Sequence, residues 1–266
     1  MSLNLTTEGD VAWLELDHGK ANEMGCEQLR GFEQLCDTLD ARALVTWTRR
    51  RSRRGTPIFI AGANVTERRG WTDDQVRAHV RWQRSVLARV RRLPLFHVGV
   101  VHGVALGWGT EYLICCDYRI ATADASFGLP ETGLGILPGA GGSSELWSLI
   151  GVPQALRLGM TCERISADEA LRIGLVQEVV PDLDAALDRA RALTARVAHN
   201  SPTSVAAFKR AVLGSVGASA ETRRELEATA YEHCVSGGDA AIGRASFEQI
   251  RAGEPVPWGP RVDFEA

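Results

Sequence analysis

Two glutamates in glycine-rich segments are the residues of this sequence whose type and spacing best suit chemistry. Glu111 ends the run Gly-Trp-Gly-Thr-Glu at residues 107–111, and Glu131 follows Pro130, 20 residues later. A helix beginning at the first glycine turn would carry Glu111 in its first turn, and Glu131 would lie at the mouth of the next turn. Two carboxylates in a water-poor site can differ in pKa and serve as base and acid. The alternatives are a charge favourably placed at a helix N-terminus and a solvated turn residue.

Three glycine-rich segments, at residues 59–64, 103–111 and 127–142, each follow a β-rich run. Glycine at a strand-to-helix turn lets the backbone approach a ligand and frees N–H groups to point at an oxygen. A helix that starts there adds the positive end of its dipole. The pattern predicts an oxyanion hole in outline. The alternative is that these glycines only form tight turns.

These segments, in this order and at these intervals, resemble the crotonase (enoyl-CoA hydratase/isomerase) superfamily, from about Val11 to about Pro181. The most specific part is the second segment, continued through Cys-Asp-Tyr-Arg-Ile-Ala at residues 116–121, together with the third. The resemblance implies a repeated ββα core and a helical C-terminal part that drives trimerisation. It also implies a thioester substrate, presented by coenzyme A or an acyl-carrier protein, with no metal and no other cofactor.

The resemblance assigns roles to individual residues. The oxyanion donors would be the backbone N–H groups of Ala63 and Trp108. Glu111 would activate water, and Glu131 would protonate the α-carbon of the substrate. The substrate-binding positions that it implies are Lys20, Ala21, Ala61, Gly62, Gly107, Pro130 and Gly139.

Trp108 departs from the family pattern, which has glycine at this position. A tryptophan keeps the backbone N–H but adds a bulky ring and loses the conformational freedom of glycine. We expect the acyl pocket to be reshaped by it, although a tryptophan in an apolar run is often only packed in a core.

The remaining pattern predicts an α/β fold. Thr72 and Gln75 form a capping-box signature for a helix that continues to Arg92. Ser166 and Glu169 form a second one. Strands are predicted at residues 11–16, 43–48, 57–60, 95–101, 118–121 and 175–180, and C-terminal helices at 183–199, 203–216, 221–235 and 239–252. We expect a core over residues 1–198 and a helical trimerisation region over residues 199–266.

Composition limits the classes of partner. Of 266 residues, 45% are hydrophobic and 24% are charged, and the formal net charge is −3. Such a chain has no general attraction to nucleic acid or an anionic membrane, which favours a small-molecule substrate. No stretch reaches the roughly 18 apolar residues of a membrane helix, and the start lacks a basic segment before an apolar run, so a cytoplasmic location is expected. The six histidines lack metal-ligand spacing.

The leading hypothesis is addition of water to a 2-enoyl thioester, or dehydration of a 3-hydroxyacyl thioester. An isomerase that moves the double bond and relies mainly on Glu131 is the nearest alternative. A non-catalytic acyl-thioester binding protein is the second. By resemblance, the assembly would be a homotrimer or a dimer of trimers.

Overall fold

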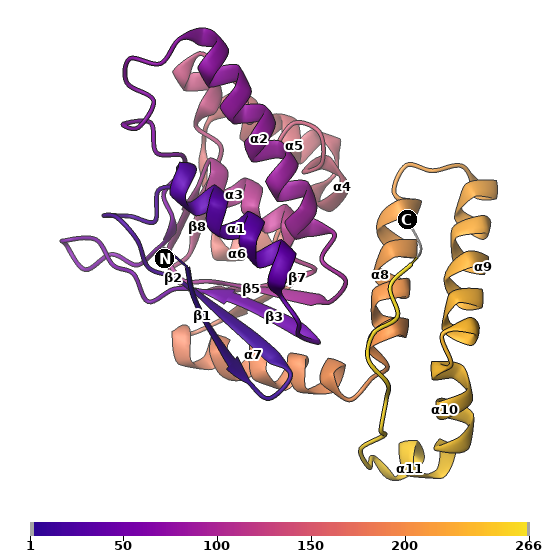
Figure 1. Ribbon diagram of the computed structural model, residues 1–266. Helices are drawn as coiled ribbons and strands as arrows, with labels where there is room; N and C mark the ends of the chain where they lie inside the picture. Colours follow the sequence, from indigo (N-terminus) through magenta and orange to yellow (C-terminus); the bar gives the residue numbers. More distant parts are fainter. Residues whose placement is uncertain (1–2, 265–266) are drawn as a thin grey trace.

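The computed structural model describes residues 3–264, which contain two β-sheets and a helical C-terminal arm (Figure 1). The larger sheet has six strands in the order β1-β2-β3-β5-β7-β10. Only β1 is antiparallel to its neighbour; the other strands are parallel. Their bounds are β1 Leu3–Glu8, β2 Val11–Leu16, β3 Ala43–Trp47, β5 Phe96–Val101, β7 Tyr118–Thr122 and β10 Glu178–Val180.

The smaller sheet has the order β4-β6-β8-β9 and carries the glycine-rich segments. Its strands are β4 Ile58–Ile60, β6 Val104–Leu106, β8 Ser126–Gly128 and β9 Arg164–Ser166. The first three are parallel, and β9 is antiparallel to β8. Because the carboxyl ends of parallel strands meet at one edge, the turns after these three strands lie together.

Helices cover both faces of the larger sheet (Figure 1). In β2, Leu14 and Leu16 belong to the larger core cluster, with Phe32 of α1, whereas Val11 and Trp13 pack with the cluster under α7. A parallel strand buried on both faces needs apolar residues at nearly every position, as β2 has. The helices over the core are α1 Cys26–Thr38, α2 Asp73–Arg91, α3 Trp108–Tyr112, η1 Leu113–Cys115, η2 Glu131–Leu134, α4 Trp147–Ile150, α5 Val152–Thr161, α6 Ala167–Arg172 and α7 Leu183–Ala198.

The C-terminal arm stands beside the core in Figure 1 and consists of α8 Pro202–Ser215, α9 Ala220–Ser236, α10 Asp239–Ala245 and α11 Phe247–Ala252. A half-buried ion pair links it to the core: Lys209 Nζ of α8 lies 2.8 Å from Asp117 Oδ2 and donates to Leu95 O at 3.0 Å. Much of the arm's apolar surface is uncovered in the single chain, and Phe208 is 72% exposed.

Most predicted elements are confirmed, with three differences. The predicted helix 239–252 is two helices, because the chain breaks at Ser246. The predicted strand 175–180 is confined to Glu178–Val180, because residues 175–176 still bond back to the end of α6. The strands β1, β6, β8 and β9 were not predicted. Among the described helices, none combines the length and apolar character that crossing a bilayer requires.

Candidate active site

The edge of the smaller sheet brings the two predicted oxyanion donors together. Ala63 follows the end of β4, and Trp108 begins α3 just after β6, the parallel neighbour of β4. Positive φ angles at Gly62 (+112°) and Gly107 (+54°) turn the chain at both places. Within residues 3–264, neither the Ala63 nor the Trp108 N–H donates a hydrogen bond. Both amides are therefore available to an external oxygen.

The predicted substrate-binding residues near Ala63 come from two adjacent segments. Ala61 N donates to Ala21 O at 3.1 Å, and Met24 N donates to Gly62 O at 2.9 Å. Residues 21–24 therefore run alongside residues 61–64. Lys20 is exposed and makes no hydrogen bond or ion pair with any residue in 3–264.

Glu111 lies in the first turn of α3 and is 3% exposed. Its Oε1 accepts hydrogen bonds from Ala140 N at 2.7 Å and Gly142 N at 2.9 Å. A Cβ on Gly142 would lie 2.5 Å from Pro138 Cβ and 3.1 Å from Glu111 Oε1. Only glycine fits at this position. We name residues 138–142 the amide turn, because two of its backbone amides donate to Glu111.

Glu131 begins η2, directly after Pro130, and lies against the turn that starts α3. A Cβ on Gly107 would lie 2.5 Å from Glu131 Oε1. The Glu131 carboxyl group therefore borders the residue that precedes Trp108. Its Oε2 is buried and has no hydrogen-bond partner among residues 3–264.

Burial shifts both carboxyl groups toward neutrality. It raises the pKa of Glu111 to about 7, against the opposing effect of the amides of Gly142 and Ala140. The charge of Glu131 contributes to this increase in the Glu111 pKa, and that of Arg84 opposes it. Burial also raises the pKa of Glu131. Acids tuned in this way can exchange protons near neutral pH.

The ring of Trp108 packs in the core. It is 1% exposed, and its centroid lies 6.1 Å from that of Phe32 and 5.9 Å from that of Tyr112. Its Nε1 has no hydrogen-bond partner within residues 3–264. The bulky Trp108 ring is thus accommodated among aromatic side chains of the core. The backbone N–H of Trp108 remains at the glycine turn.

Sequence reasoning missed the groups that hold Glu111. From the amide turn it named only Gly139, whose carbonyl accepts a hydrogen bond from Arg84, and not Ala140 or Gly142. The signal available was the pair of consecutive glycines at 141 and 142. A backbone N–H group is the same for every residue except proline. The two glycines therefore predicted a turn, but not that its amides donate to Glu111.

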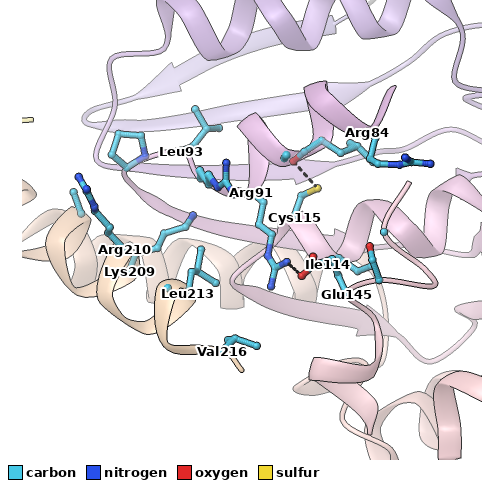
Figure 2. Close-up of a pocket in the computed structure, with 18 of the residues that line it drawn as sticks. Arg84, Arg91, Leu93, Ile114, Cys115, Glu145, Lys209, Arg210, Leu213 and Val216 are labelled. Carbon is cyan, nitrogen blue, oxygen red and sulfur yellow. Dashed lines mark hydrogen bonds and ion pairs between the residues drawn. The ribbon is translucent and has the colours of Figure 1, made fainter. Parts of the chain in front are cut away.

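A cavity of about 840 Å³ lies between the core and the arm (Figure 2). It is lined by α2, by the chain from Ala140 to Trp147, and by α8, and neither Glu111 nor Glu131 lines it. The carboxylate pair therefore does not line this cavity, although Ala140, which donates to Glu111, does. Across residues 3–264, no group of three or more His, Cys, Asp or Glu side chains is placed to hold a metal ion.

Comparison with known proteins identifies the family. The family model described as enoyl-CoA hydratase/isomerase matches residues 52–253. A short-chain-enoyl-CoA hydratase of Clostridium acetobutylicum is 32% identical over 257 residues, which cover 94% of this chain and 97% of the relative. An enoyl-CoA isomerase/hydratase of Mycosarcoma maydis is 34% identical over 198 residues, covering 73% and 71%.

The fold agrees with these relatives. The crystal structure of an enoyl-CoA hydratase from Bacillus anthracis superimposes with a TM-score of 0.86 at 31% identity, covering 97% of this chain and 99% of that one. The predicted fold, a crotonase-like α/β core with a helical C-terminal region, is thereby confirmed. The chain belongs to the enoyl-CoA hydratase/isomerase (crotonase) superfamily, as its three glycine-rich segments predicted.

Proposed function

We propose that this protein adds water reversibly to the double bond of a 2-enoyl-CoA thioester, with Glu111 and Glu131 as its acid/base pair. One observation carries the proposal: the buried carboxyl group of Glu111 and the half-buried one of Glu131, both with raised pKa values, flank the turn that presents the free Trp108 amide. Membership of the superfamily supports an acyl-CoA substrate. An acyl-carrier thioester has the same reactive group.

In the proposed reaction, the thioester oxygen accepts hydrogen bonds from the N–H groups of Ala63 and Trp108. Glu111 takes a proton from water as the water oxygen forms a bond to the β-carbon. The electron pair of the double bond moves toward the carbonyl, and the two amides stabilise the enolate charge. Glu131 then donates its proton to the α-carbon. Proton exchange between the pair and solvent restores both groups, and no metal takes part.

We further propose that residues 1–198 form the catalytic core, and that residues 199–266 assemble it into a trimer or a dimer of trimers. Ala21, Ala61, Gly62, Gly107, Pro130 and Gly139 border the substrate in this proposal. Lys20, exposed at the start of the segment that runs beside Ala61, would meet the coenzyme. The apolar surface that the arm exposes in the single chain supports the assembly.

Hydration of crotonyl-CoA by the wild-type enzyme, Glu111→Gln and Glu131→Gln tests the reaction. Each variant should lose at least about 100-fold in kcat, since each lacks one proton transfer. Full activity in both variants would contradict the assigned roles. An isomerase would instead tolerate Glu111→Gln and lose turnover only in Glu131→Gln. A non-catalytic binding protein would bind acyl-CoA in a titration but would not convert it to product.

A further inference from the structure

Helix α2 contacts the amide turn at Gly139. Arg84 Nε donates to Gly139 O at 2.9 Å. One helical turn earlier, Val80 packs so closely on the same residue that a Cβ on Gly139 would lie 3.1 Å from Val80 Cγ1. Residues four apart lie on one face of a helix, so a single stripe of α2 fixes Gly139.

The contact with Arg84 and the contact with Glu111 lie on the same peptide group. The carbonyl of Gly139 and the N–H of Ala140 are the two ends of one planar unit, so orienting one end orients the other. Arg84 bonds to the carbonyl, and Ala140 N donates to Glu111 Oε1 at 2.7 Å. A cation on the carbonyl also polarises the peptide and strengthens the hydrogen bond that its N–H donates.

The second donor to Glu111 is fixed in a similar way. The N–H of Gly142 shares a peptide group with the carbonyl of Gly141, which accepts a hydrogen bond from Glu145 N at 2.7 Å. The Glu145 carboxylate in turn pairs with Arg91 of α2, as the dashed line in Figure 2 marks. Helix α2 therefore supports both peptides that bind Glu111.

We propose that Arg84 is a positioning residue for Glu111, which acts through the peptide group between Gly139 and Ala140. The inference rests on the proposed role of Glu111 as the base. Arg84 lines the cavity of Figure 2, which neither glutamate lines, and it is linked to Glu111 through this peptide group. The charged groups that act on Glu111 are Arg84 of α2 and Glu131 of η2, in opposite directions.

The test compares kcat/KM for crotonyl-CoA against pH in Arg84→Met, Arg84→Lys and a control. Without the cation, Glu111 ionises at higher pH. In Arg84→Met, the acidic limb of the kcat/KM profile should therefore move to higher pH by about half to one unit. The rate at pH 6 should fall about three- to tenfold and return near wild type at pH 9, with KM unchanged. Arg84→Lys keeps the charge and should shift the limb less.

The control is Arg77→Met, since Arg77 pairs with Asp73 and Asp74 of its own helix. Its profile should superimpose on that of the wild type. An acidic limb that does not move in Arg84→Met, or a loss of equal size at every pH, would overturn the proposal. A ¹³C NMR titration of the Glu111 carboxyl group in the same variants reads the effect of Arg84 directly. If the wild type hydrates no enoyl-CoA, the proposed function fails, while this titration still decides the role of Arg84.

Discussion

Glu111 is ionisable, buried and bonded to two backbone amides, so its protonation and the stability of the fold depend on each other. Burial raises its pKa from 4.5 to about 7 in the folded chain. Between these values the folded state keeps a proton that the unfolded state releases. The fold therefore loses stability as the pH rises from about 4.5 to about 7. Burying the ionised form of Glu111 destabilises the folded state.

The substitution Glu111→Gln removes this dependence on pH. We expect the free energy of unfolding of the variant, relative to wild type, to rise by on the order of 3 kcal/mol between pH 4 and pH 8. Urea denaturation of both proteins at the two pH values measures the difference. The same difference at both values would mean that the Glu111 pKa is not raised by folding.

Gly107 lies close to both glutamates. It borders the Glu131 carboxyl group, and the next residue, Trp108, begins the helix α3 that carries Glu111. Gly107→Ala would place a methyl group 2.5 Å from the present position of Glu131 Oε1. Displacing a catalytic group by about 1 Å lowers activity about 100-fold. We expect that loss in crotonyl-CoA hydration.

Gly217→Ala is the matched control. Gly217 also has a positive φ (+73°), but a Cβ there meets open space. Gly217→Ala should lose about 1 kcal/mol of stability from backbone strain, Gly107→Ala should lose more because of the close contact with Glu131, and only Gly107→Ala should lose activity. Equal activity in the two variants would contradict the placement of Glu131 against Gly107.

The side chains of the candidate site were predictable, and their supports were not. Glu111 and Glu131 stand in glycine-rich segments whose order resembles a family, so residue type and spacing both pointed to them. Ala140 acts through its backbone, which any residue possesses, and Arg84 lies in a helix that the sequence predicts only as amphipathic. Their roles appear only when the turn and α2 are brought together in space.

Among the elements, α2 has the capping box that its sequence predicts. Thr72 Oγ1 accepts from Gln75 N at 3.3 Å, and Gln75 Oε1 accepts from Thr72 N at 2.8 Å. The predicted box at Ser166 is only half formed. Ser166 Oγ accepts from Glu169 N at 3.3 Å, but the Glu169 carboxylate pairs with two arginines, Arg157 and Arg172.

These two caps give a test at the scale of the element. Thr72→Ala removes one bond of a complete box, and we expect a loss of about 1 kcal/mol. Ser166→Ala should cost less, because the Glu169 side chain does not take part in that cap. Urea denaturation compares them, and a larger loss for Ser166→Ala would contradict this interpretation.

The strands β3 and β5, of five and six residues, are largely buried and apolar and were predictable from the sequence. The strands β6 and β8 have only three residues each and lie inside glycine-rich segments, where local propensity is weak. They exist because a parallel neighbour completes their hydrogen bonds. Likewise, the break between α10 and α11 falls at Ser246 itself, three residues after the nearest glycine, Gly243.

At the scale of the whole molecule, the arm exposes an apolar stripe. Phe208 and Val212 lie four residues apart on α8, and both are exposed, as is Val216 at its end. Residues at this spacing share one face of a helix. A face of this kind is typical of a surface covered by a neighbouring subunit.

Sedimentation should therefore give three or six times the mass of one chain. Phe208→Asp should dissociate the assembly, because it places a charge in the stripe that we expect to be buried between subunits. Arg224→Asp, at an exposed polar position of α9, is the control and should leave the assembly intact. A monomeric wild type would contradict the assembly that we propose.

The central claim is that Glu131 exchanges a proton with the α-carbon of a thioester whose oxygen is bound by the amides of Ala63 and Trp108. Incubation with butyryl-CoA in D₂O isolates this step, because a saturated substrate cannot add water. We predict α-hydrogen exchange, followed by NMR, in the wild type and in Glu111→Gln, and its loss in Glu131→Gln. Exchange that survives in folded Glu131→Gln would contradict the account.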